Sequence, residues 1–222
     1  MTGTLLGNHP VAVIGLAAAT AAYAAVHRLG ATYGSTKQER RTRLPGDDIV
    51  RRPQFRVTHA ITIDVPSEQV WPWLVQMGWH RGGWYTARWV DRLLFPANTP
   101  SLNRLDPALQ HLEVGDFVPD GPPESECGFT VVQLTPNRAL VLHSTSHLPL
   151  SWRERLGAAI EWTWSFVLVP QNAGRSTRFL FRWRGRVAPW WAVTGCWLLV
   201  IPADFVMSRD MLRGVKSRAS GG

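Results

Sequence analysis

The sequence predicts an α+β fold in which a curved antiparallel sheet wraps around a long C-terminal helix. The first observation behind this prediction is a series of segments between residues 55 and 186 in which apolar and polar residues alternate, as they do in strands. The second is a helical pattern of apolar residues from Asp204 onward. The third is the order of the elements: one strand, two short helices, several strands and the terminal helix.

Residues 1–30 are predicted to form an N-terminal apolar helix, a candidate membrane anchor. Residues 10–26, PVAVIGLAAATAAYAAV, carry no charge and approach the length of about 17–25 residues that spans a bilayer. Basic residues follow, so the positive-inside rule predicts that the rest of the chain lies in the cytoplasm. A secretory signal is disfavoured because residues 1–10 hold no Lys or Arg. A helix packed on the domain is the alternative to an anchor.

The next residues predict a linker, a strand and two short helices. Residues 31–54 are expected to be a basic linker with a turn at LPGDD and few residues for a core. Alternation over 55–63 predicts a strand, after which Ser67 is expected to cap a helix. Pro72 should kink that helix or delay its start. A second short helix is predicted over 85–94, after the break at Gly-Gly.

The middle of the chain predicts antiparallel strands. VGDFVP predicts a short strand, and GFTVVQLTPNRALVLHS predicts two strands around the turn at residues 135–138. Residues 161–186 are the clearest hairpin. One of its faces should be strongly aromatic, with Trp162, Trp164, Phe166, Leu168, Thr177, Phe179, Phe181 and Trp183. The opposite face should be basic and solvent-exposed, with Arg178, Arg182, Arg184 and Arg186.

The C-terminal stretch is predicted to cover the aromatic face of the sheet. Residues 190–201 are largely apolar, Pro202 interrupts them, and the amphipathic helix follows. A second transmembrane span is disfavoured because arginines flank both ends of this stretch. We expect the Trp-rich start of the helix to lie either in the core or at a bilayer interface, where tryptophan is favoured.

Several motifs in this order resemble the SRPBCC superfamily, the START, Bet v 1-like and polyketide-cyclase-like proteins. They are LPGDDIV, ITIDVPSEQVWPWLVQMG, RGGWY, VGDFVPDGP, GFTVVQLTPNRALVL and DFVMSRDMLRGVK. The resemblance covers residues 44–218 and implies a helix-grip fold, with a ligand-binding domain at 55–218 whose sheet and C-terminal helix enclose a cavity for a hydrophobic molecule. Members of the superfamily include lipid carriers, hormone binders and aromatase/cyclases. No pattern of catalytic residues is carried over.

Other functional classes find little support in the sequence. The formal charge of +8 comes almost entirely from arginine, but no nucleic-acid-binding motif accompanies it, so nucleic acid is not an expected partner. The two cysteines form no CxxC motif. His143 and His147 lie in a strand that runs into a loop, where four residues span about 13 Å, so no metal site is expected. No cofactor or nucleophile motif is present.

The aromatic residues are predicted to line a cavity rather than only to fill a core. The predicted ligand-binding residues are Arg81, Trp84, Tyr85, Trp89, Trp164, Phe181 and Trp183. Among them, the Arg81 guanidinium is the expected anchor for a carboxylate, a phosphate or a lipid headgroup. The candidates for acid–base chemistry are His80, Asp91, Glu113, Asp116 and Glu161, each of which also has an ordinary structural explanation.

The sequence is therefore consistent with three functions. The preferred hypothesis is binding or transport of a hydrophobic small molecule or lipid in an aromatic-lined cavity, at the cytoplasmic face of the membrane. The alternative is a cyclase- or dehydratase-type enzyme acting on a polyketide-like or isoprenoid substrate, which needs a titratable group that faces the cavity. The third is a membrane-associated interaction protein with a filled core, which would use its basic faces on anionic lipid.

Overall fold

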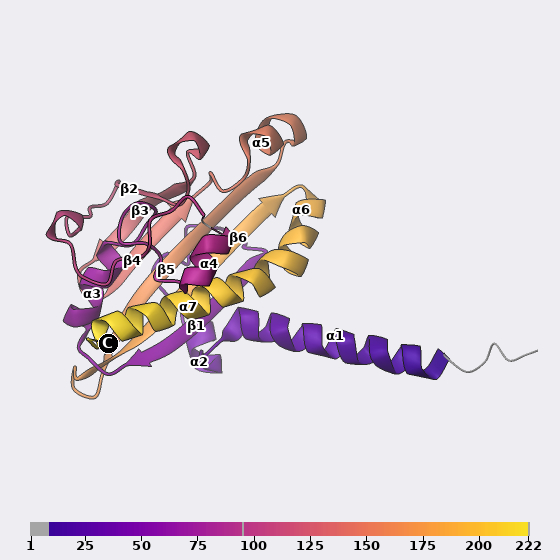
Figure 1. Cartoon of the computed structure of the whole chain (residues 1–222), viewed down its shortest axis with the longest axis horizontal. Coiled ribbons are helices and arrows are strands. Elements are labelled where there is room, and N and C mark those ends of the chain that lie inside the picture. The colour runs from indigo at the N-terminus through magenta and orange to yellow at the C-terminus, as the bar shows by residue number, and fades with distance from the viewer. Residues whose placement is uncertain (1–8, 95, 222) are drawn as a thin grey trace, which may run out of the picture.

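The protein is described by a computed structural model over residues 9–94 and 96–221. A single antiparallel sheet holds six strands in the order β1-β6-β5-β4-β3-β2 (Figure 1). The strands are β1 (Phe55–Ile63), β2 (Phe117–Pro119), β3 (Gly128–Thr135), β4 (Ala139–Ser144), β5 (Ala159–Gln171) and β6 (Ser176–Ala188). Each predicted strand is confirmed. Strands β5 and β6 form the longest hairpin, as the alternation predicted.

Helices lie on both faces of the sheet and extend from it. They are α1 (His9–Thr32), α2 (Lys37–Arg41), α3 (Ser67–Val75), α4 (Arg88–Leu94), α5 (Leu150–Leu156), α6 (Trp190–Gly195) and α7 (Ile201–Ala219), with short 3₁₀ turns at Pro107–Leu109 and Pro123–Ser125. A π-helical turn at Cys196–Val200 joins α6 to α7. In Figure 1, α7 runs diagonally across the sheet. The predicted α+β class and helix-grip arrangement are confirmed.

The core lies between the aromatic face of the sheet and α7. Cross-strand register places Trp164 opposite Trp183 and Phe166 opposite Phe181, so the large rings of β5 and β6 face one another in pairs. From α7, Met211, Leu212 and Val215 are fully buried against this layer. The predicted amphipathic pattern of the terminal helix is thus explained by burial of one side on the sheet.

The outer face of the sheet differs from the expected basic, solvent-exposed surface. Residues 36–50 pack over it, and Leu44 and Val50 are buried there, although few residues of this segment were expected in a core. Arg182 is fully buried and donates hydrogen bonds to the Thr58 hydroxyl, to the backbone carbonyls of Glu39 and Thr42, and to the Asp47 carboxylate at 2.7 Å. A buried guanidinium needs such partners, and the chain supplies them.

Helix α3 begins at Ser67, the residue that was predicted to be its N-cap, and so starts one residue earlier than expected. Pro66 occupies the cap position, and Ser67 is the first helical residue, whose hydroxyl donates to the Glu68 carboxylate at 3.4 Å instead of accepting from the backbone. Pro72 therefore does not delay the start of α3. It lies within the helix, which ends three residues later at Val75.

Helix α1 extends away from the sheet but is joined to the domain at its C-terminal end (Figure 1). Gly30 lies so close to α7 that an added Cβ would be 2.9 Å from the Ile201 carbonyl oxygen. The Tyr23 hydroxyl donates a 2.7 Å hydrogen bond to the Leu198 carbonyl, and the His27 ring stacks on Trp197 at 4.6 Å. The α-helical partner of the Leu198 carbonyl would be residue 202, a proline without an N–H, and Tyr23 donates to this carbonyl from the neighbouring helix.

Among the described residues, two helical stretches are long and apolar enough to cross a membrane, Val11–Thr32 and Trp190–Ala219. They differ in their surroundings. The side chains of residues 11–26 are exposed or nearly so, whereas α7 buries one side in the core of the domain. Residues 11–26 of the N-terminal stretch therefore leave their apolar side chains exposed, which is compatible with a membrane span.

Candidate functional site

A cavity of about 320 Å³ lies between the sheet and the first turns of α7. Its walls come from β5, β6, the π-helical turn, α7 and two loops at one edge of the sheet. The lining residues are Asp120, His147, Trp162, Trp164, Trp183, Leu199, Val200, Ala203, Asp204 and Met207. The wall is mainly apolar and aromatic, but it carries three polar groups, which decide its chemistry.

Asp204 is the first of these groups. Its Oδ2 accepts a 2.8 Å hydrogen bond from the Trp183 indole N–H and a 3.0 Å bond from the Ser208 hydroxyl. Within the described part of the chain, Oδ1 accepts no hydrogen bond. Protein atoms surround the carboxylate, and this desolvation raises the pKa of Asp204 to about 6, although the two hydrogen bonds act in the opposite direction.

His147 and Asp120 form the second polar end of the cavity. The Trp162 N–H can only donate and lies 3.1 Å from His147 Nδ1, so Nδ1 is an acceptor and the ring proton is assigned to Nε2. Nε2 then donates to Asp120 Oδ2 at 2.9 Å. The other carboxylate oxygen, Asp120 Oδ1, is buried and has no hydrogen-bond partner among residues 9–94 and 96–221. An unpaired buried oxygen of this kind costs stability, because the hydrogen bond that it makes to water in the unfolded chain is not replaced.

The predicted aromatic residues of the sheet meet at this cavity. Trp164 and Trp183 line it. Phe181 is fully buried beside Trp164, with ring centroids 5.5 Å apart. Trp84 packs edge-on against the Trp164 ring at 5.2 Å and is itself buried. Phe181 and Trp84 therefore support the wall from behind and are not in its surface.

The loop RGGWY is a packed structural element and does not reach over the cavity mouth. Gly78 and Gly83 form a β-bridge, and the Arg81 guanidinium donates to the carbonyls of Met77 and Val75, at the C-terminal end of α3. A cation at this position satisfies carbonyls that a helix end leaves unpaired. The Tyr85 hydroxyl donates to the Trp73 carbonyl at 2.9 Å, so Tyr85 is also committed to the core.

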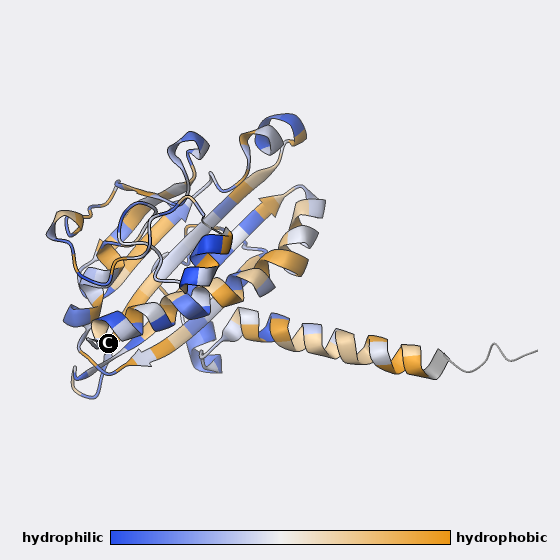
Figure 2. Cartoon of the chain, in the orientation of Figure 1, coloured by the Kyte–Doolittle hydropathy of each residue, from blue (hydrophilic) through white to orange (hydrophobic). Residues whose placement is uncertain are grey.

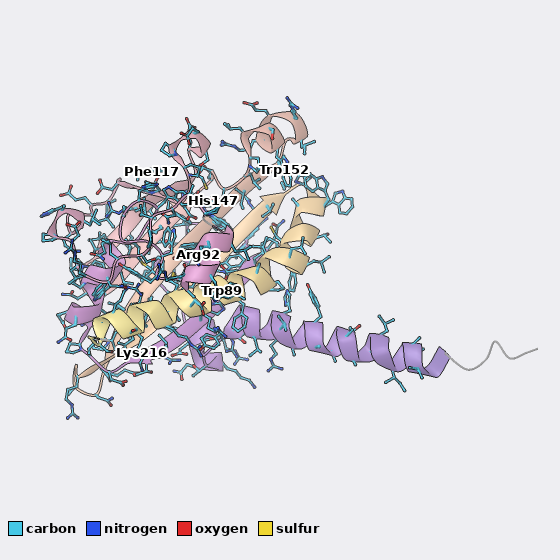
Figure 3. All side chains as sticks on the ribbon, in the orientation of Figure 1. Trp89, Arg92, Phe117, His147, Trp152 and Lys216 are labelled. Carbon is cyan, nitrogen blue, oxygen red and sulfur yellow. The ribbon has the colours of Figure 1, made fainter. Side chains whose placement is uncertain are left out.

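Trp89 lies away from the cavity. It projects from α4, the short helix in front of α7, and 57% of its surface is exposed (Figure 3). The acid–base candidates also lie elsewhere: the Asp91 carboxylate is bonded to the Thr86 hydroxyl, and Glu161 pairs with His143 and Arg186. His80, Glu113 and Asp116 do not line the cavity either.

Sequence reasoning missed the polar residues of the site. Asp204 was used only to mark the start of the amphipathic helix, and His147 was considered only as a metal ligand. One signal was present: Asp204 is the single acidic residue between positions 190 and 209, inside an otherwise apolar stretch. An isolated carboxylate in such a stretch needs a partner or a function, because burying a charge is costly.

Comparisons with known proteins identify no family for the chain. No family model matches it, and no curated protein sequence matches it. Among solved structures, a protein from Arthrobacter aurescens is 12% identical, with a TM-score of 0.44, over 75% of this chain and 87% of its own. A conserved protein from Geobacillus kaustophilus is 13% identical, with a TM-score of 0.42, over 75% and 96% of the two chains.

A third structure is DynU16, a protein of the dynemicin biosynthetic locus. It is 15% identical to the present chain, with a TM-score of 0.33, over 72% of this chain and 47% of its own. Because all three TM-scores lie below 0.5, neither the fold nor the function of the present chain is inferred from these similarities.

Proposed function

We propose that the protein binds a hydrophobic small molecule or a single lipid chain in the cavity between the sheet and α7, as an SRPBCC-like domain held at the cytoplasmic face of the membrane by α1. The observation that carries the proposal is the cavity itself. Its volume of about 320 Å³ lies at the lower end of the range of about 300–1,000 Å³ that is usual for small-molecule sites. A compact ring system or one acyl chain suits this volume.

The polar groups of the wall favour a ligand that carries a hydrogen-bond donor. Within residues 9–94 and 96–221, Asp204 Oδ1 accepts no hydrogen bond, whereas the unpaired Asp120 Oδ1 is buried. Within residues 9–94 and 96–221, no Arg or Lys lines the cavity, so an anionic headgroup would meet carboxylates and no cation. A hydroxyl or amino group on an otherwise apolar ligand matches both features. Arg81 had predicted an anionic ligand. Because the Arg81 guanidinium is bonded to backbone carbonyls, a ligand with a hydrogen-bond donor is proposed instead.

The proposal is tested by ligand discrimination. The full-length chain in detergent micelles is titrated with 1-pyrenemethanol and with 1-methylpyrene, and energy transfer from tryptophan reports binding. We expect a preference for the alcohol of about ten- to hundredfold, as for a hydrogen bond to a charged group. Asp204→Leu should abolish that preference, whereas Asp204→Asn should retain part of it because an amide oxygen can still accept.

A second variant tests the place of binding. Ala203 lies at the accessible edge of the cavity, and Ala203→Phe should fill the mouth and weaken binding of both pyrenes. Arg213→Phe, at an exposed position of the same helix, is the control and should bind them normally. Equal binding by the wild type and Ala203→Phe would contradict the proposal. Native mass spectrometry of the protein from its own membranes should also detect a bound apolar molecule.

One observation favours the alternative function, a cyclase- or dehydratase-type enzyme. An acid–base catalyst works best when its pKa is near the working pH, and Asp204, with a pKa of about 6, faces an apolar cavity. In such an enzyme Asp204 would move the proton, and the His147–Asp120 pair would hold a second polar group of the substrate. If Asp204→Asn retains ligand binding but stops conversion of a co-purified compound, the enzyme is supported over the carrier.

A further inference from the structure

We propose that the exposed apolar side chains of α5, α6 and the π-helical turn form a second membrane contact, which places the mouth of the cavity in the interfacial layer of the bilayer that α1 enters. We call these side chains the apolar ridge. They are Leu150, Trp152, Leu156, Trp190, Trp191, Trp197, Leu198 and Leu199. The inference rests on the proposed membrane span and gives the proposed ligand a route of entry.

The ridge is too exposed to be explained as part of the core. The exposed fractions of Trp190 and Leu199 are 78% and 72%. Four of its eight members are tryptophans, the residue that is most enriched where a bilayer meets water. Contiguous apolar patches of this kind mark a contact with a protein or a membrane.

The position of the ridge relative to α1 favours a contact with a membrane over one with a protein. Leu198 and Trp197 are bound directly to Tyr23 and His27, the last turn of α1 before its first charge at Arg28. At about 1.5 Å per residue, this turn is the end of an uncharged segment about 25 Å long. If α1 spans the bilayer, the π-helical turn must therefore lie where the hydrocarbon gives way to headgroups.

The ridge continues from the π-helical turn to α5. The rings of Trp152 on α5 and Trp191 on α6 are in contact, with centroids 5.9 Å apart. Figure 1 shows α5 and α6 at the end of the domain toward which α1 extends, and Figure 3 places Trp152 there. Figure 2 shows hydrophobic residues along both α1 and the start of the terminal helix. Helix α5 carries Arg153 and Arg155 against Glu154, a net positive charge that suits anionic lipid headgroups.

The cavity opens within this surface. Leu199 belongs to the ridge and also lines the cavity, and its neighbour Val200 and the exposed Ala203 line the same wall. A ligand dissolved in the membrane could then enter past Leu199 without crossing bulk water. The carboxylate of Asp204, one turn further along α7, would meet its hydroxyl or amino group.

The first experiment measures where the ridge lies. Full-length protein with Cys127→Ser and Cys196→Ser is labelled with a fluorophore at single cysteines replacing Trp190 or Leu199, in vesicles of phosphatidylcholine and phosphatidylglycerol. Spin-labelled lipid should quench both sites strongly, and iodide should quench them weakly. Trp89 and Val114, which are 57% and 62% exposed but lie outside the ridge, are the control positions and should show the reverse. Iodide quenching of Trp190 and Leu199 at the control level overturns the proposal.

The alternative partner of the ridge is a second copy of the chain. Dilution of the protein distinguishes a membrane contact from a dimer. Lipid quenching should persist unchanged when the protein is diluted to one copy per vesicle. Quenching by lipid that is weak at this dilution, together with energy transfer between labelled copies at higher density, would assign the ridge to a dimer and overturn the membrane contact.

The second experiment measures ligand entry. The double variant Trp190→Glu/Leu156→Glu changes ridge residues that do not line the cavity. It should slow uptake of 1-pyrenemethanol from vesicles at least tenfold and leave its affinity in detergent micelles unchanged, whereas Val114→Glu should change neither. Unaltered uptake from vesicles overturns the entry route. If the wild type binds no pyrene in micelles, the proposed function fails, while the quenching experiment still decides whether the ridge contacts lipid.

Discussion

The indole N–H of Trp183 and the Oδ2 of Asp204 are joined by a 2.8 Å hydrogen bond between β6 and α7. This bond fixes one carboxylate oxygen on the wall of the cavity, while the other accepts from no donor in the part of the chain that the structure describes. A single contact between the sheet and the terminal helix therefore both orients the most unusual titratable group of the site and makes it available to a ligand.

The first prediction concerns the pH dependence of stability at Asp204. Its pKa is about 6 in the folded protein and near 3.8 in the unfolded chain, so the folded state holds the proton more tightly. The stability gained from that proton is present below pH 3.8 and is lost as the pH rises through about 6. The free energy of unfolding of the wild type minus that of Asp204→Asn should fall between about pH 4 and 6 and stay level above. Urea denaturation in detergent micelles measures it; a difference that does not vary with pH would contradict the assignment.

The second prediction concerns the Trp183 donor. Trp183→Phe keeps a ring in the wall but removes the N–H that lowers the pKa of Asp204. The pKa should therefore rise above about 6, which infrared titration of the carboxyl band can follow. Trp164→Phe is the control, because Trp164 lines the same cavity without bonding to Asp204. This variant should leave the pKa of Asp204 unchanged.

The third prediction concerns the buried ion pair under residues 36–50. Asp47 lies 2.7 Å from Arg182 and 3.1 Å from Arg184. Asp47→Ala leaves a buried guanidinium without its counter-charge and should cost about 3–5 kcal/mol of unfolding free energy. The neighbouring Asp48 pairs with Arg43 at the surface, and Asp48→Ala should cost less than about 1 kcal/mol. Similar losses for the two variants would mean that the segment does not cover the sheet.

The fourth prediction concerns His59, which lies fully buried on β1 and bonds to the Gly30 carbonyl at 2.6 Å. Burial lowers the pKa of His59 to about 4 from 6.5. Its contribution to stability is present above pH 6.5 and is lost as the pH falls toward 4, because the unfolded chain then binds the proton more readily. His59→Gln should remove this loss, while the exposed His111→Gln should not. Tryptophan fluorescence during acid unfolding of the three proteins makes the comparison.

The sequence predicted the elements well because alternation and helical periodicity are local. The strands from Phe55 to Ala188 and the amphipathic helix beyond Asp204 each carry their own pattern within a few residues. The pairing of aromatic rings on one face of β5 and β6 followed from the same alternation. These features do not depend on which distant segment packs against them.

The parts that escaped prediction depend on contacts between distant segments. Arg182 alternates with Phe181 and Trp183, so its position predicted exposure, but Asp47 and the carbonyls of residues 39 and 42 lie about 140 residues away. Likewise, nothing near Arg81 in the sequence shows that its guanidinium satisfies the end of α3. His147 and Asp120 come from two separate loops, and only the folded sheet brings them to the wall that Asp204 faces.

The close junction at Gly30 has a mechanical consequence. Helix α1 passes into residues 33–35, which hydrogen-bond along the edge of β1 through the Tyr33 carbonyl and the Ser35 hydroxyl, so no flexible linker separates α1 from the sheet. If α1 spans the bilayer as proposed, the domain is therefore held in a fixed orientation at the membrane surface. The proposed ligand would then reach the cavity by lateral diffusion in the bilayer, and its transfer to a second membrane would require a separate soluble acceptor.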